Sequence, residues 1–94
     1  MKITYNDLVH NKACSKGREY FANRWTLVGE PDHTEILAKL DEEKDNNSYG
    51  TWLMKTFKLT GTNTTYEDDG KVYCKSEWVD GVRVKMSVPM VKMK

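Results

Sequence analysis

Two Asp-Gly pairs, Asp69-Gly70 and Asp80-Gly81, lie eleven residues apart in the last third of the chain. Aspartate followed by glycine readily supplies the positive backbone dihedrals that a tight hairpin turn needs. An alternating segment, 71–78, lies between the pairs, and a second one, 82–88, follows directly. Period-two alternation is typical of half-buried strands, so this region predicts an antiparallel β-meander.

The predicted meander has strands at 62–67, 71–78 and 82–88. Successive side chains of a strand point to opposite faces, so its apolar residues should turn inward together. The inward set is Val72, Cys74, Val82, Val84, Met86 and Val88. The outward set is Tyr73, Lys75, Glu77, Arg83, Lys85 and Ser87. Pro89 cannot donate to a ladder and should end the third strand or lie on a sheet edge, leaving 90–94 as a tail or short edge segment.

The N-terminal part of the chain predicts helices. Thr4 followed by Asp7 indicates a capped helix over 5–12, because the threonine oxygen can accept a free amide of the first turn. We expect a break near 11–14, after which Ser15 caps a second helix. This second helix should end near Arg24 and turn Tyr20, Phe21 and Trp25 to the core.

A third helix is predicted after the loop marked by Gly29 and Pro31, with Thr34 as its cap. Its apolar stripe is Ile36, Leu37 and Leu40, and its outer acidic face is Asp41, Glu42, Glu43 and Asp45. The run 46–48 should close it. Segment 49–60 fits helical spacing, although its threonines and aromatics also suit a strand. We predict a helix there, because Ser48 and Gly61 punctuate both ends.

Length and composition indicate one α+β domain. Ninety-four residues are enough for one core but too few for two independent ones. The prediction is therefore a single domain over 1–94, in which 1–61 is mainly helical and 62–94 forms the meander and tail. The N-terminal helices should pack on one face of the three-stranded antiparallel meander.

Nothing in the sequence indicates a membrane span or a secretory signal, so the chain is expected in the cytoplasm. A reducing compartment argues against a bridge between Cys14 and Cys74, the two cysteines of the chain. Both fall on apolar positions and are expected to be free, buried thiols.

The net charge is +1, yet the charges are unevenly spread. Residues 30–45 carry seven acids against two bases, and residues 71–94 carry six bases against two acids. A near-neutral total argues against a nucleic-acid mimic and against a protein that wraps nucleic acid. Two regions of opposite sign can orient a charged partner.

Catalytic and metal sites find little support in the sequence. His10 and Cys14 have helical metal-ligand spacing, and His33 with Cys74 could complete a zinc site, but the close Cys-x-x-Cys pairs of structural zinc sites are absent. A reactive cysteine needs a base within reach, which spacing does not establish. The acidic run at 41–45 is typical of a solvated helix end rather than of paired catalytic carboxylates. We therefore expect no enzyme activity, metal or cofactor.

The outward face of the sheet is the most distinctive predicted surface. Its candidate binding residues are Tyr73, Lys75, Arg83 and Lys85. An aromatic residue among bases on an open sheet is how several single-strand binders hold nucleic acid. Glu77 interrupts this patch, and basic residues on an exposed strand face also serve simply for solubility.

The stretch 11–21, with Trp52-Leu53-Met54 about thirty residues later, resembles a pattern in small accessory proteins of phages and prophages. In that pattern an Ala-Cys pair begins a helix, a glycine and an aromatic follow, and a Trp-Leu-rich helix comes next. The resemblance covers about the first sixty residues and leaves the meander unmatched. It implies a phage or mobile-element protein that binds and inhibits a host protein or ribonucleoprotein complex, as anti-CRISPR proteins do.

Two functions follow as hypotheses. The first is a non-enzymatic inhibitor that docks on a host protein complex, with the acidic helix end and the basic sheet as surfaces of opposite sign. The second is a nucleic-acid-binding regulator that uses the basic sheet face. No membrane partner is expected for either.

Overall fold

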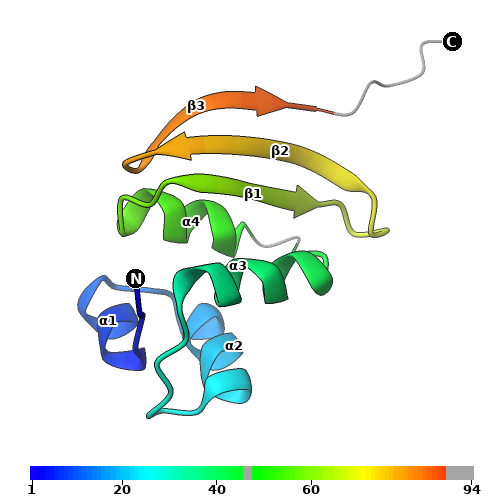
Figure 1. Ribbon diagram of the computed structural model, residues 1–94. Helices are drawn as coiled ribbons and strands as arrows, with labels where there is room; N and C mark the ends of the chain where they lie inside the picture. The colour runs from blue at the N-terminus through cyan, green and yellow to red at the C-terminus, as the bar shows by residue number, and fades with distance from the viewer. Residues whose placement is uncertain (46–47, 89–94) are drawn as a thin grey trace, which may run out of the picture. The chain divides into compact units, whose positions relative to one another are not determined.

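The computed structural model describes residues 1–45 and 48–88; the predictions for Asn46, Asn47, Pro89 and the segment 90–94 lie outside these ranges. Within them, four helices precede a three-stranded antiparallel sheet, which confirms the predicted α+β class with a C-terminal meander (Figure 1). The chain groups into two compact units, Met1–Ala38 and Lys39–Lys94. Across the described ranges, no helix combines the length and the apolar character that a membrane span requires.

The first helix of the N-terminal unit, α1 (Tyr5–His10), begins as predicted. The Asp7 amide donates to Thr4 Oγ1 at 3.1 Å, and the Thr4 amide donates to Asp7 Oδ2 at 2.9 Å. This reciprocal capping box satisfies two amides that the helix itself leaves without partners. Leu8 is the buried residue of α1.

The second helix, α2 (Ser15–Trp25), corrects two predictions that concern Cys14. Cys14 rather than Ser15 is the N-cap, because its Sγ accepts the Gly17 amide at 3.4 Å. In that position Cys14 is exposed, whereas Cys74 is buried and both thiols are free. Of the three aromatics expected in the core only Phe21 is fully buried, with its ring centroid 5.3 Å from that of Trp25.

The third helix, α3 (His33–Glu42), starts in the N-terminal unit and ends in the second. Asp32 rather than Thr34 caps it, since Asp32 Oδ2 accepts the Thr34 amide at 3.1 Å. Ile36 and Leu40 are buried as predicted. The helix ends at Glu42, so the last residue of the predicted acidic face, Asp45, lies beyond the helix.

The ambiguous segment forms a helix, α4 (Tyr49–Thr56), and this prediction is confirmed. Ser48 is its N-cap but makes no side-chain cap bond; instead, Asp45 Oδ2 accepts the Gly50 amide at 3.3 Å. The helix ends earlier than expected, at Thr56, and Gly61 belongs to the next strand rather than to the helix end.

The strands β1 (Gly61–Tyr66), β2 (Val72–Val79) and β3 (Val82–Ser87) pair in the order β1-β2-β3, close to their predicted bounds. Asp80 and Gly81 have φ angles of 49° and 82°, the two positive values of a tight hairpin. The first Asp-Gly pair forms a wider turn, in which Gly70 alone has a positive φ, 87°, and its amide donates to the Glu67 carbonyl at 2.9 Å.

The core of the second unit lies between α4 and one face of the sheet. α4 contributes the buried Leu53 and Met54, and β2 contributes Cys74 and Trp78. Of the six residues predicted to turn inward only Cys74 is buried; Val72 and Met86 lie on its face of the sheet but are exposed, as are Val82, Val84 and Val88. Alternation identifies a strand, but it does not reveal whether another element covers that strand.

Candidate functional site

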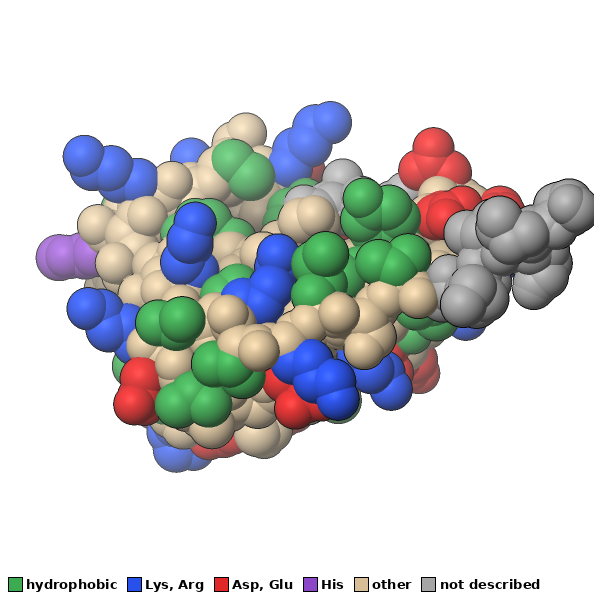
Figure 2. All heavy atoms as spheres, turned by 90° about the horizontal axis from the view of Figure 1, so that it is seen from above, with side chains coloured by type: hydrophobic (Ala, Val, Ile, Leu, Met, Phe, Trp, Pro, Cys, Tyr) green, Lys and Arg blue, Asp and Glu red, His purple; other side chains and the backbone are tan. Residues whose placement is uncertain are grey.

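The most unusual surface of the described chain is the edge strand β3. All six of its residues are exposed, including Val82 at 61%, Val84 at 57% and Met86 at 53%. β3 is the uppermost strand in Figure 1, and Figure 2 shows the molecule from above that view. On this side, hydrophobic side chains lie interspersed with Lys and Arg (Figure 2). Isolated exposed apolar residues are ordinary, but a row of them on one strand is typical of an interaction site. We call residues 82–86 the β3 edge.

A β-bulge determines where the side chains of the β3 edge point. Glu77 pairs with Lys85 and Trp78 pairs with Arg83, so Val84 is an extra residue without a partner on β2. Directly opposed residues of antiparallel strands share a face. Arg83 therefore lies on the face of Trp78, and its guanidinium carbon is 5.0 Å from the Trp78 ring centroid.

This placement divides the predicted basic face. Tyr73 and Lys75 alternate with the buried Cys74 on β2, and Lys85 shares their face through its pairing with Glu77. The expectation that Arg83 joins them is wrong, because the bulge shifts the alternation of β3 by one residue. Arg83 instead donates to Met86 Sδ at 3.6 Å. The outer face therefore holds two of the three predicted bases, with an acid directly opposite one of them.

The predicted acidic face is also divided. Asp45 is buried at 6% exposure, and its backbone carbonyl accepts the Tyr66 amide at 2.8 Å. It therefore joins α4 to β1 rather than facing solvent. Asp41, Glu42 and Glu43 are exposed, and Glu42 Oε1 lies 3.2 Å from Lys39 Nζ.

Tyr66 connects the exposed part of the acidic run to the sheet. Its hydroxyl donates to Asp41 Oδ1 at 2.6 Å. That hydrogen bond, together with partial burial and the negative charge of Asp41, raises the pKa of Tyr66 to about 12, since each factor disfavours the phenolate. Asp41 thus has a structural partner within its own unit.

A buried polar network beneath the sheet was not predicted from the sequence. Trp78 Nε1 donates to Asn63 Oδ1 at 2.6 Å, and Asn63 Nδ2 donates to Thr51 Oγ1 at 3.4 Å. No buried side-chain nitrogen or oxygen in the described ranges lacks a partner. An asparagine among threonines in β1 was the available signal, because buried polar groups persist only when they are hydrogen-bonded.

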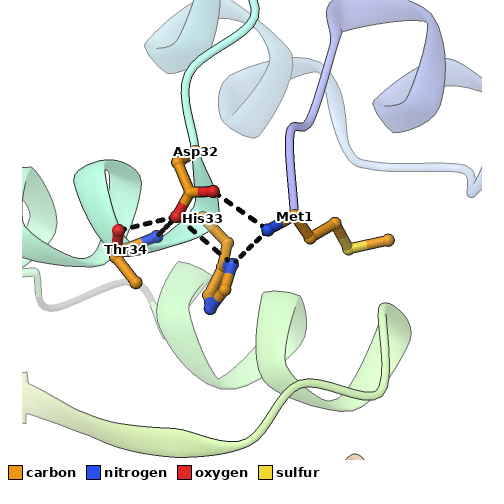
Figure 3. Close-up of polar contacts among 4 residues, drawn as sticks. All are labelled: Met1, Asp32, His33 and Thr34. Carbon is orange, nitrogen blue, oxygen red and sulfur yellow. Dashed lines mark hydrogen bonds and ion pairs between the residues drawn. The ribbon is translucent and has the colours of Figure 1, made fainter.

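A second polar cluster lies at the start of α3 (Figure 3). Asp32 accepts from the Met1 amino group at 2.9 Å and from the Thr34 hydroxyl at 2.6 Å. Both bonds hold the pKa of Asp32 far below its usual range, and the bond from the Thr34 side chain has the larger effect. His33 Nδ1 lies 3.2 Å from the same amino group. The cluster fastens the first residues to α3, alongside the backbone bond from the His33 amide to the Met1 carbonyl.

Residues 1–45 and 48–88 contain no group of three or more His, Cys, Asp or Glu residues arranged to hold a metal ion. No protein-family model, curated protein or solved structure matches the chain. The candidate site therefore rests on the chain's own geometry.

Proposed function

We propose that this chain is a non-enzymatic binding protein that docks on a protein complex through the β3 edge and the adjoining outer face of β2. One observation carries the proposal: an edge strand exposes Val82, Val84 and Met86 with two bases between them. Exposing apolar side chains contributes nothing to the stability of an isolated chain, whereas covering them on binding is favourable.

The chemistry of the surface agrees with a protein partner. Arginine, methionine and tyrosine are enriched at protein interfaces; the β3 edge carries Arg83 and Met86, and the outer face of β2 carries the 58% exposed Tyr73. Arg83 is already held against Trp78 and Met86, so little side-chain freedom remains to be lost when it meets a partner. We expect Met86 and Val84 to act as the apolar anchors and Lys75 with Lys85 to steer association.

The resemblance of residues 11–21 and 52–54 to small phage accessory proteins supplies the proposed biological context. In that context the partner is a host protein or ribonucleoprotein complex, and binding blocks its action, as anti-CRISPR proteins do. The acidic residues Asp41, Glu42 and Glu43 form a separate exposed surface, and we assign it no role in binding.

The test is affinity capture from a bacterial lysate with three versions of the chain: wild type, the double variant Val84→Glu with Met86→Glu, and Val9→Glu. Val9 is an exposed valine of α1 and serves as the matched control. Proteins retained by wild type and by Val9→Glu but lost with the double variant support the proposal. If every captured protein is retained equally by the double variant, the proposal is wrong.

A nucleic-acid-binding regulator remains the second candidate, because Tyr73, Lys75 and Lys85 share the outer face. The placement of Arg83 on the other face and of Glu77 opposite Lys85 weakens it. Titration with single- and double-stranded DNA and RNA at two salt concentrations separates the candidates. Salt-sensitive binding that Lys75→Ala reduces and Arg83→Ala leaves unchanged favours the regulator.

A further inference from the structure

We infer that the β3 edge accepts an extended segment of the partner as a fourth strand, and that this segment alternates acidic and apolar residues. The inference rests on the proposed function and adds the mode of binding and the chemistry of the bound segment. Strand addition to a sheet edge combines backbone hydrogen bonds with side-chain selectivity.

The first argument is that β3 is a free edge. The order β1-β2-β3 leaves one side of β3 without a strand in the described chain, and outside its ladder with β2 no backbone bond involves residues 82–87 in that range. Such a strand presents a row of backbone donors and acceptors to any segment that can pair with it.

The second argument is that the opposite edge strand, β1, is held by other parts of the chain and lacks purely aliphatic side chains. β1 packs more extensively on α4 than β3 does, its Asn63 side chain is hydrogen-bonded beneath the sheet, and the Tyr66 amide is bonded to Asp45. None of the six residues of β1 has a purely aliphatic side chain. An incoming apolar strand therefore finds matching side chains at β3 and not at β1.

The third argument decides between a second copy of the chain and another protein. Two β3 strands paired antiparallel about Lys85 would bring the two Lys85 side chains opposite each other on the outer face. Like charges in such positions are destabilising, and a basic edge strand is a recognised barrier to self-association. Lys85 favours an acidic residue beside it on the outer face, and the next residue of an alternating segment, on the opposite face, is then apolar and covers Met86.

The bulge at Val84 adds to this selectivity. A bulge bends its strand and increases the local twist, which discourages pairing with flat, generic strands. The edge is thus exposed to solvent and is selective at the same time. An acidic, apolar segment that is free to follow the twist is the occupant that meets both conditions.

The experiment measures amide hydrogen exchange of the labelled full chain by NMR. The probe is a capped peptide of about eight alternating Glu and Val residues, long enough to span one strand. We expect exchange to slow by about tenfold or more at the β3 amides that face away from β2, with no change along β1. Two control peptides carry Lys in place of Glu, or methyl groups on alternate backbone nitrogens, and neither should protect β3.

Charge variants of the chain complete the test. Lys85→Glu should weaken binding of the Glu-Val peptide about five- to tenfold, and Lys55→Glu, on the exposed side of α4, should leave it unchanged. Equal binding of the Lys peptide, protection by the methylated peptide, or protection along β1 overturns the inference. Protection of β3 by protein concentration alone assigns the edge to a second copy, which also overturns it.

Failure of strand addition can be told apart from failure of the proposed function. If a captured partner depends on Val84 and Met86 but leaves the β3 amides unprotected, the partner binds the side chains alone, and only the further inference fails. If the Glu-Val peptide protects β3 but no captured protein depends on those two residues, the inference stands as a property of the edge, and the proposed function fails.

Discussion

The two edge strands of the sheet are held in the fold in different ways. β1 is fastened along its length: Asn63 bonds to Thr51 and Trp78, and Tyr66 bonds to Asp45 through its amide and to Asp41 through its hydroxyl. β3 is joined to the described chain by its ladder with β2, by contacts with α4 that are fewer than those of β1, and by the turn at Gly81, whose amide donates to the Leu59 carbonyl at 3.0 Å.

The burial of the two edge strands is the opposite of what the polarity of their residues suggests. β1 consists mainly of threonine and asparagine and yet is largely shielded, whereas β3 carries two valines and a methionine and is exposed throughout. Polar side chains hold β1 because each buried one has a hydrogen-bond partner. The apolar side chains of β3 stay more than half exposed in the described chain. The comparison teaches that β1 is an edge used for folding and that β3 is an edge left available.

Removing the anchor of β1 should have the largest effect on stability. Asn63→Ala leaves the buried Trp78 indole donor without its partner, so we expect a loss of about 2 to 4 kcal/mol in the free energy of unfolding. The neighbouring Thr62→Val changes an exposed side chain and should stay within about 0.5 kcal/mol. Urea denaturation of both variants measures the difference. A loss below about 1 kcal/mol for Asn63→Ala means that the network does not hold β1.

The two hairpin glycines provide the next test, because each leads to a different edge. A Cβ on Gly81 would lie 2.7 Å from the Lys58 Cα, whereas one on Gly70 would meet only the flexible Lys44 side chain, at 3.2 Å. Both residues have positive φ angles, so each substitution carries backbone strain. We expect Gly81→Ala to cost about 2 to 3 kcal/mol and Gly70→Ala about 1 kcal/mol, measured by urea denaturation. Equal losses contradict the close packing of the turn at Gly81 against Lys58.

The sequence predicted the positions of the strands well because turn chemistry is local. The Asp-Gly pairs mark both hairpins, and the three strands begin and end within one residue of their expected bounds. Helix ends were less predictable, since neighbouring side chains compete to cap them: Cys14 and Asp32 took the roles expected of Ser15 and Thr34.

The candidate site was only partly predictable, because its geometry depends on contacts distant in sequence. The placement of Tyr73, Lys75 and Lys85 on one face follows from alternation. Arg83 departs from it because the Val84 bulge is a property of the pairing with β2 and leaves no mark in the β3 sequence alone. Asp45 resembles its acidic neighbours in sequence, yet it is buried through bonds to α4 and β1.

The bond between Tyr66 and Asp41 should have a smaller effect, which depends on pH. The pKa of Tyr66 is raised to about 12, above the value of about 10 for an unfolded chain. Its contribution to stability is therefore complete below about pH 10 and is lost as the pH rises towards 12. Because both groups are partly exposed, we expect Tyr66→Phe to cost less than about 1 kcal/mol at neutral pH.

Ultraviolet titration of the tyrosines checks this assignment. Tyr66 should ionise near pH 12, and Tyr66→Phe should remove that step. Tyr73→Phe is the matched control: Tyr73 lies on the exposed face of β2, and its loss should leave the high-pH step in place. A high-pH step that persists in Tyr66→Phe contradicts the assignment of that step to Tyr66 and its bond to Asp41.

The smallest expected effect is also the most direct test of the comparison. The double variant Val82→Thr with Val84→Thr keeps the branched shape of both side chains and replaces one methyl group of each by a hydroxyl. Because both residues are more than half exposed, the free energy of unfolding should change by less than about 0.5 kcal/mol. Urea denaturation measures this, and a loss above about 1 kcal/mol shows that the valines pack within the folded chain. An unchanged stability means that folding does not require the apolar character of Val82 and Val84, as expected of side chains that serve binding.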